Sequence, residues 1–166
     1  LVTAHRMRCL AIDLTQSCFH AMYICIMVKT KKNQNNAFKN YDQVLGFKVL
    51  EWTDGNSLIA APIDLKLRNR GRSIHGGVIA SLIKIAGTMA GNSTAKGIRK
   101  TQIINLNVNF ISGTRANLVH VRGRRTHSTK GTLFSDIEIF DPETGVLIAN
   151  GQAVFKLLRP NVKKTV

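Results

Sequence analysis

The sequence predicts an α+β domain in which a curved antiparallel sheet wraps around one buried helix. One segment, residues 76–89, combines helical length with apolar residues on nearly all of its faces, which is typical of a helix enclosed on every side. Four segments with strand character follow this helix one after another, and consecutive strands form an antiparallel sheet with the helix on one face. At 166 residues and 44% hydrophobic, the chain is long enough to bury such a core in one domain.

The region before the domain is expected to form a separate extension. Residues 18–28 are an apolar run too short to span a bilayer, which needs about 20 residues, and we interpret the run as a helix that packs on the domain or on a partner. The polar, basic stretch 29–36 predicts a linker. We therefore expect an N-terminal helical extension with its linker (1–36), a main domain (37–158) and a C-terminal tail (159–166).

The same extension also contains signals of the cellular compartment in which the protein functions. Basic residues precede the apolar run, so an organellar, for example mitochondrial, targeting remnant is a second interpretation of it. All three cysteines, Cys9, Cys18 and Cys25, lie there, and their odd number and spacing match no zinc site. We interpret them as buried or free thiols in a reducing, intracellular compartment.

The first elements of the main domain have clear local signals. A short helix at 38–45 is expected to lead into a strand at 46–52. The turn sequence Asp54-Gly55-Asn56 then separates this strand from a second one at 57–67. Pro62 places an edge or a bulge within that second strand, and Gly91-Asn92 is expected to stop the buried helix.

After the helix we expect strands at 101–111, 117–125, 132–140 and 146–157. In the first of these, Ile104, Leu106, Val108 and Phe110 alternate with three asparagines, so the four apolar side chains are expected to share one face. The turn that begins at Asp141 predicts a hairpin at the C-terminal end of the domain.

The charge of the chain is strongly unbalanced, with 24 Lys and Arg against 9 Asp and Glu and a net charge of +15. Thirteen basic residues and no acidic one lie between Asp64 and Asp136. A solvated basic face would explain a short run, but self-repulsion over so long a span favours an anionic partner. Nucleic acid, an anionic membrane surface and a polyphosphate such as coenzyme A are the candidates. The low aromatic content, 6%, favours contact with an RNA backbone over base stacking.

The most informative motif opens the buried helix. Asn69 precedes the turn His75-Gly76-Gly77, and two glycines at a helix start bring bare N–H groups close to a ligand. These groups lie at the positive end of the helix dipole and can bind a developing oxyanion. The alternative interpretation is a plain strand-to-helix turn with a satisfied core histidine.

This order of features resembles the hotdog-fold acyl-CoA thioesterases, especially the phenylacetate-pathway and thioesterase-superfamily-member type. The features are Asn69, the His75-Gly76-Gly77 turn, the apolar helix and the alternating strand Leu106 to Phe110. The resemblance runs from about Tyr41 to Leu158. It implies a hotdog fold, hydrolysis of an acyl-CoA without a required cofactor, and homodimers or tetramers with sites at the subunit boundary.

The resemblance also implies roles for individual residues. The Gly76 N–H would polarise the thioester carbonyl, Asn69 would position water or substrate, and His75 would hold the turn. Family members often carry a Ser or Thr early in the next strand, where this chain has Ile103, with Thr101 close by.

The family's catalytic carboxylate lies nine residues after the histidine, and that position is Lys84 here. A lysine cannot replace an acid there unless burial lowers its pKa, and no acidic residue occurs in the helix or the following strand. Three hypotheses remain open: an active thioesterase with an unusual arrangement around Lys84, an inactive hotdog domain within a large heteromeric, RNA-containing assembly, and a coenzyme A sensor without turnover.

The nucleotide of coenzyme A is implied to contact two loops, one after the strand 101–111 and one before the strand 132–140. The residues concerned are Phe110, Arg115, Thr129, Lys130, Gly131 and Thr132. Arg115 and Lys130 would meet phosphates. The alternative is that Lys130-Gly131 is an ordinary basic hairpin loop.

Overall fold

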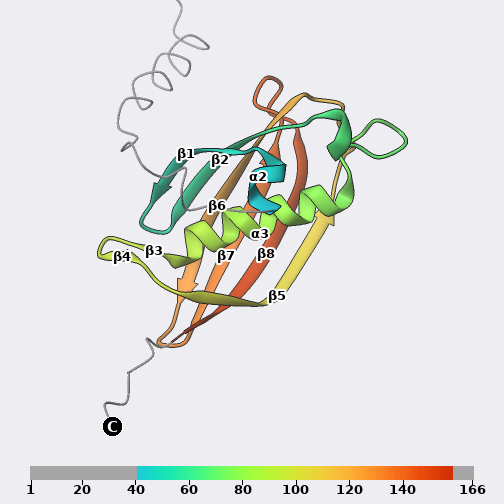
Figure 1. Cartoon of the computed structure of the whole chain (residues 1–166). Coiled ribbons are helices and arrows are strands. Elements are labelled where there is room, and N and C mark those ends of the chain that lie inside the picture. Colours follow the sequence, from blue (N-terminus) through green and yellow to red (C-terminus); the bar gives the residue numbers. More distant parts are fainter. Residues whose placement is uncertain (1–40, 159–166) are drawn as a thin grey trace, which may run out of the picture. The chain divides into compact units, whose positions relative to one another are not determined.

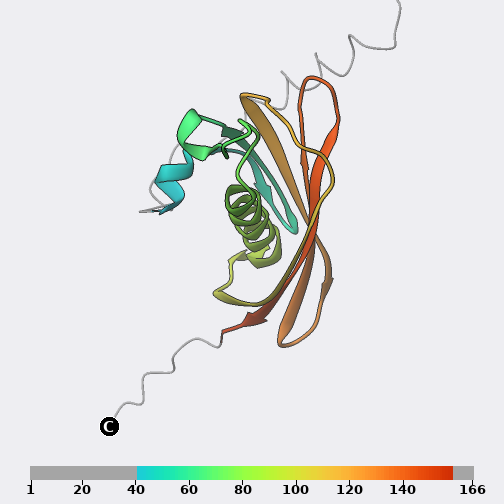
Figure 2. The same ribbon diagram turned by 90° about the vertical axis from the view of Figure 1, so that its right-hand side faces the viewer.

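The computed structural model describes residues 41–158, which form a curved antiparallel sheet with one long helix on its concave side (Figures 1 and 2). The helix is α3 (Gly76–Asn92). The sheet order is β1-β2-β6-β7-β8-β5, and all neighbouring strands are antiparallel. The strands are β1 (Lys48–Thr53), β2 (Asn56–Pro62), β5 (Thr101–Phe110), β6 (Leu118–Ser128), β7 (Thr132–Phe140) and β8 (Leu147–Leu157). The predicted fold class is therefore confirmed.

Smaller elements complete the described part of the chain. A short helix, α2 (Tyr41–Leu45), precedes β1, and a two-stranded hairpin of β3 (Ser93–Thr94) and β4 (Gly97–Ile98) follows α3. No helix within residues 41–158 is long and apolar enough to cross a membrane. The predicted N-terminal extension with its cysteines and the predicted tail at 159–166 lie outside the described residues.

The packing of α3 against the sheet depends on two strand glycines. A Cβ at Gly123 would lie 2.6 Å from the carbonyl oxygen of Ala86, and one at Gly151 would lie 2.9 Å from Cγ2 of Ile83. The Ser57 hydroxyl donates a hydrogen bond of 2.8 Å to the same Ala86 carbonyl. The backbone of α3 therefore approaches the sheet more closely than any side chain at position 123 would allow.

Two strand boundaries differ from the predictions by three residues or more. The second strand was expected to continue to residue 67, but β2 ends at Pro62 and Leu65–Leu67 form a 3-10 turn. Proline has no N–H with which to continue the ladder, so the strand ends where it occurs. In contrast, β6 runs three residues beyond the predicted end, to Ser128.

The alternation predicted for β5 is interrupted by a bulge. The register shifts between Ile103 and Asn105, so Ile103 packs against the core together with Leu106. Ile104 is 58% exposed. The prediction that Ile104 shares a face with Leu106 is therefore wrong, because the extra residue of a bulge reverses the side on which later side chains lie.

Candidate functional site

A tight loop precedes α3. The Asn69 N–H donates to the Ser73 carbonyl (2.8 Å), and the Ser73 N–H donates to Oδ1 of the Asn69 side chain (3.1 Å). Arg72 adopts a positive φ of 64°, which is uncommon for a residue with a Cβ. The carbonyl oxygen of the Asn69 side chain therefore closes the loop, and its NH₂ group is the part that can face a ligand.

The start of α3 leaves one amide free. The His75 side chain caps the helix, since its Nδ1 accepts the Gly77 N–H at 3.0 Å, and the His75 carbonyl accepts the N–H groups of Val78 and Ile79. Within residues 41–158 the Gly76 N–H has no hydrogen-bond acceptor. This half-buried amide lies at the positive end of a 17-residue helix, where an oxyanion is favoured.

We call the turn of residues 69–77, which leads into α3, the elbow. Arg68 connects this elbow to the loop between β5 and β6. Its guanidinium donates five hydrogen bonds of 2.9 to 3.1 Å. The acceptors are the carbonyls of Ile63, Arg72, Arg115 and Ala116 and the Oδ1 of Asn117. Arg68 is thus a structural clamp, and this correction removes it from the basic residues that were expected to meet an anionic partner.

Phe110 forms an apolar wall beside the free amide. A Cβ added to Gly76 would lie 3.4 Å from Cε1 of Phe110. The structure therefore brings together three residues of the predicted site, His75, Gly76 and Phe110, and places Asn69 in the loop that leads into them. The main chain of Arg115 joins them through Arg68 (3.1 Å), while the Arg115 side chain is exposed.

Lys84 lies elsewhere on α3. Eight residues separate it from Gly76, which corresponds to about 12 Å along a helix axis, so one thioester carbonyl cannot contact both residues of one chain. The exposed Lys84 lines a hollow of about 210 Å³ together with Asp42 of α2 and Trp52 of β1. The indole N–H of Trp52 donates to the Met89 carbonyl at 2.8 Å and fixes this wall to the helix.

The hollow contains a carboxylate that the sequence did not suggest. Asp42 and Lys84 both line it, although no ion pair joins them. The hydroxyl of Tyr41 lies 3.0 Å from that of Ser81, which holds α2 against α3. The sequence-based prediction considered acids in the helix and the following strand only, whereas Asp42 belongs to another helix, α2.

The second part of the predicted nucleotide site is a tight turn between β6 and β7. The Thr129 hydroxyl accepts the N–H groups of Gly131 (3.2 Å) and Thr132 (2.9 Å), and Lys130 is exposed at the tip. The 11 residues of β6 separate this turn from Arg115. At about 3.3 Å per residue this strand is roughly 36 Å long, and Figure 1 shows its two ends at opposite ends of the sheet.

Comparisons with known proteins show which folds and which family this domain is similar to. No curated protein sequence matches the chain. The fold is similar to that of a conserved protein from Pseudomonas aeruginosa, with a TM-score of 0.70 and 25% sequence identity over 75% of this chain and 98% of that chain. It is also similar to zebrafish thioesterase superfamily member 2 (TM-score 0.67, 19% identity, 88% and 100% covered) and to the PaaI protein of the Escherichia coli phenylacetic acid degradation operon (0.66, 21%, 85% and 91%).

The profile of the thioesterase superfamily matches residues 71–148. The described domain has the hotdog fold, and this central part of it is similar to the thioesterase superfamily. The matched region begins in the elbow before α3 and ends in β8, so it includes the free Gly76 amide and the Phe110 wall. The hotdog prediction is thereby confirmed. The individual site residues remain predictions, now with a defined geometry.

The hotdog domain contains two functional features that sequence reasoning missed. Arg68 could not be recognised as a clamp, because its acceptors are mainly backbone carbonyls 4 to 48 residues away. The sequence did not point to Asp42, because this residue precedes the acid-free stretch that starts after Asp64 and belongs to a separate short helix. A carboxylate in a short helix just before the first strand was the available signal.

Proposed function

We propose that this protein binds acyl-CoA thioesters with the thioester carbonyl at the start of α3, and hydrolyses them. The free Gly76 N–H carries this proposal, because it is an unused donor at a helix N-terminus beside an apolar wall. Such a donor stabilises the negative charge that develops on the carbonyl oxygen. Water adds to the acyl carbon, the C–S bond breaks, and the sulfur takes up a proton, which yields a carboxylic acid and coenzyme A.

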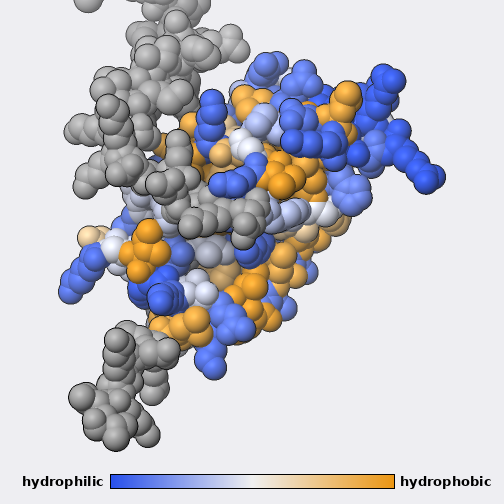
Figure 3. All heavy atoms as spheres, in the orientation of Figure 1, coloured by the Kyte–Doolittle hydropathy of each residue, from blue (hydrophilic) through white to orange (hydrophobic). Residues whose placement is uncertain are grey.

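A second copy of the chain is needed to complete the site. β5 is an edge strand of the sheet. It exposes apolar side chains at Ile104 and Phe110, and the exposed Ile111 follows it directly. Figure 3 shows hydrophobic atoms along this edge of the domain. An exposed apolar edge strand is a template for pairing with another chain. We propose that two β5 strands pair antiparallel in a homodimer, and two such dimers can stack into a tetramer.

This pairing unites the separated parts of the coenzyme A site. Thr101 is at the end of β5 that faces Leu157, and the Leu157 N–H donates to the Gly131 carbonyl at 2.8 Å. Antiparallel pairing sets the Thr101 end of one chain against the Phe110 end of the other. The turn 129–132 of one subunit then lies at the Arg115 end of the second, where Lys130 and Arg115 can meet the phosphates of one nucleotide.

The same arrangement supplies a carboxylate. An ammonium group has no lone pair to accept a proton from water, so Lys84 alone cannot activate the nucleophile. We propose that Asp42 does so from the hollow that it shares with Lys84, acting on a thioester held by Gly76 of the other subunit. Lys84 adds a positive charge beside it that favours the anionic substrate.

Measurement of thiol release from short, long and aryl acyl-CoAs tests this function. Asp42→Asn is expected to lower turnover by about 10²- to 10⁴-fold, the usual contribution of a general base. Asp64→Asn is the matched control, because Asp64 is an exposed acid paired with Lys66 at 3.6 Å. A parent protein without turnover on any substrate rules out the hydrolase, and an Asp42→Asn variant as active as the parent rules out the role of Asp42.

The dimer has its own test. Ile104→Lys places a charge on the β5 edge and is expected to shift sedimentation towards the monomer. Leu65→Lys is the control, because it changes a side chain that is 82% exposed on the 3-10 turn. This control variant should sediment like the parent. Equal sedimentation of the two variants would contradict pairing through β5.

The lysine at position 84 favours a second candidate function. In this alternative the domain is catalytically inactive and serves as a structural subunit of a large assembly whose RNA or other anionic partner meets the basic surface. Lys84→Asp separates the alternatives: hydrolysis that appears only in this variant shows a pocket that lacks just its acid. Salt-sensitive co-sedimentation of the parent with an RNA-containing complex supports the assembly, and a free homodimer at all salt concentrations counts against it.

A further inference from the structure

A cationic hollow lies at the opposite end of α3 from the acyl site. It has a volume of about 560 Å³ and is bounded by the β1–β2 turn, the β3–β4 hairpin and β6. Asn92 ends α3 16 residues after Gly76, which corresponds to about 24 Å along the helix axis. This hollow is therefore separate from the Gly76 amide of the same chain.

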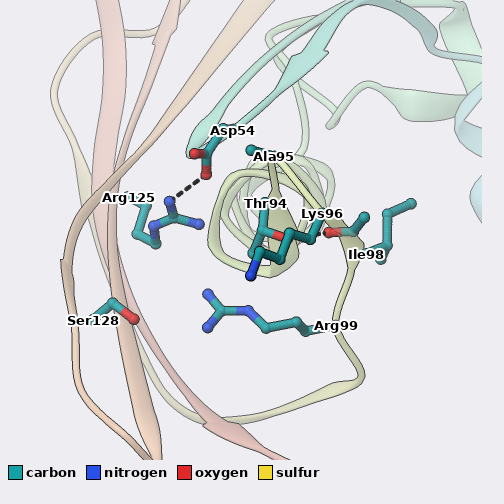
Figure 4. A pocket seen from close by; sticks show the side chains of 9 residues that line it. Asp54, Thr94, Ala95, Lys96, Ile98, Arg99, Arg125 and Ser128 are labelled. Atoms are coloured by element: carbon teal, nitrogen blue, oxygen red, sulfur yellow. Dashed lines mark hydrogen bonds and ion pairs between the residues drawn. The ribbon is translucent and has the colours of Figure 1, made fainter.

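Three basic side chains converge in the hollow, against one carboxylate (Figure 4). Arg125 is engaged within the protein, because its guanidinium donates to the carbonyl of Ser93 and, at 2.5 Å, to Oδ1 of Asp54. Lys96, in contrast, forms no ion pair with any described residue. Arg99 and Lys96 thus leave about two positive charges without a counter-charge.

Arg99 has donors that the protein does not use. One terminal nitrogen donates to the Gly91 carbonyl at a long 3.4 Å. Its Nε is buried and has no hydrogen-bond partner, which is costly for a charged group. Burial, followed by the nearby charge of Arg125, lowers the pKa of Arg99, and Asp54 offsets only part of this effect. The group is therefore short of negative charge and of acceptors.

We propose that this hollow binds the phosphate group of a small phosphorylated molecule. The guanidinium of Arg99 offers a planar fork that matches two phosphate oxygens. Figure 4 shows the Lys96 amine on one side of this fork and the Ser128 hydroxyl on the other. The nearby Asp54 and the carbonyl end of α3 oppose any anion, but the three basic side chains outweigh them, and the resulting net attraction is larger for a doubly charged phosphate than for a carboxylate.

The lining indicates a small molecule and not a polynucleotide. None of the nine residues that line the hollow is aromatic, whereas single-stranded RNA is usually held by bases stacked on aromatic side chains. The hollow also lies between a hairpin and a strand and does not form an extended groove. It can hold one phosphate or pyrophosphate group.

Calorimetric titration of the full chain with inorganic phosphate and with pyrophosphate tests this site. Lys96→Gln and Arg99→Lys are expected to weaken pyrophosphate binding by about 10- to 100-fold, the effect of losing a hydrogen bond to a charged group. Lys100→Gln is the matched control, since Lys100 is exposed and lies outside the lining. Should Arg99→Lys fold poorly, Lys96→Gln changes only an exposed side chain and keeps the test intact.

The outcomes are distinct. The proposal is overturned if neither anion binds, if Lys100→Gln weakens binding as much as Lys96→Gln, or if a short RNA binds while pyrophosphate does not. A KM for acyl-CoA that is unchanged in Lys96→Gln identifies a separate phosphorylated compound as the source of the phosphate, and a raised KM identifies coenzyme A itself. Because binding is measured directly, the result holds whether or not the protein hydrolyses thioesters.

Discussion

Removal of a single N–H group tests the acyl site most directly. Gly76 is the first residue of α3, and proline is well tolerated there because the N–H of that position has no helical acceptor. The preceding residue, His75, already has the extended conformation that a following proline requires (φ −66°, ψ 134°). Gly76→Pro therefore deletes the donor while the helix is preserved.

The size of the expected decrease in kcat depends on how many free backbone N–H donors the start of α3 has. The N–H groups of Gly77, Val78 and Ile79 are taken by His75, so the Gly76 amide is the free donor at this helix start within the described residues. Loss of one oxyanion donor lowers kcat by about 10²- to 10³-fold, or about 2.7 to 4 kcal/mol. We expect a decrease in this range for Gly76→Pro.

Gly76→Ala is the matched control, because it keeps the N–H. Its Cβ would lie 3.4 Å from the Phe110 ring, so a change in kcat of less than about tenfold, or about 1.4 kcal/mol, is expected. Thiol release under saturating acyl-CoA gives kcat, and thermal unfolding confirms that both variants fold. If Gly76→Pro turns over as fast as Gly76→Ala, the amide does not bind the oxyanion and the proposed chemistry is refuted.

Three further predictions concern stability, measured by urea unfolding. Gly123→Ala should lower the free energy of unfolding by about 1–3 kcal/mol through overpacking against α3, whereas Gly131→Ala, with no atom within 4 Å of the added Cβ, should change it little. Burial and the charge of Arg122 lower the pKa of His120, so the unfolded chain binds this proton more tightly. Stability is expected to fall as pH drops below about 6.5, and His120→Gln should flatten that decrease. Arg68→Lys should destabilise by about 2 kcal/mol, because an ammonium cannot reach five acceptors.

The sequence predicted those features that depend on the hydrophobicity or the local backbone requirements of the residues themselves. Apolar residues around most of 76–89 predicted the buried helix, and ten of the 17 residues of α3 are buried, although Lys84 on its outer side is exposed. The His75-Gly76-Gly77 turn predicted the helix start, because a cap and small residues are local requirements of the backbone. Local chemistry determines these features, so the sequence was enough to find them.

Features that depend on distant partners were not predictable. Alternation in β5 cannot reveal the bulge at Ile104, because the pattern of residues 104–110 is equally regular in either register. Arg68 was assigned to the basic surface, although backbone carbonyls far along the chain satisfy it. Asp42 reaches the hollow of Lys84 only through the packing of α2 on α3.

In a single chain, two pairs of predicted site residues lie too far apart to act together, and the proposed dimer accounts for both. Gly76 is about 12 Å along α3 from Lys84, and the length of β6 separates Arg115 from Lys130. Flexing of one domain does not close either distance, because both are set by rigid elements packed on one core. The antiparallel pairing of two β5 edges that we propose would turn the helices antiparallel and bring each half of the site against the other half in the second chain. The Ile104→Lys variant should therefore lose turnover in proportion to its loss of dimer, although no residue proposed to contact the substrate has changed. A monomeric variant that keeps full activity would show that a single chain contains the complete site.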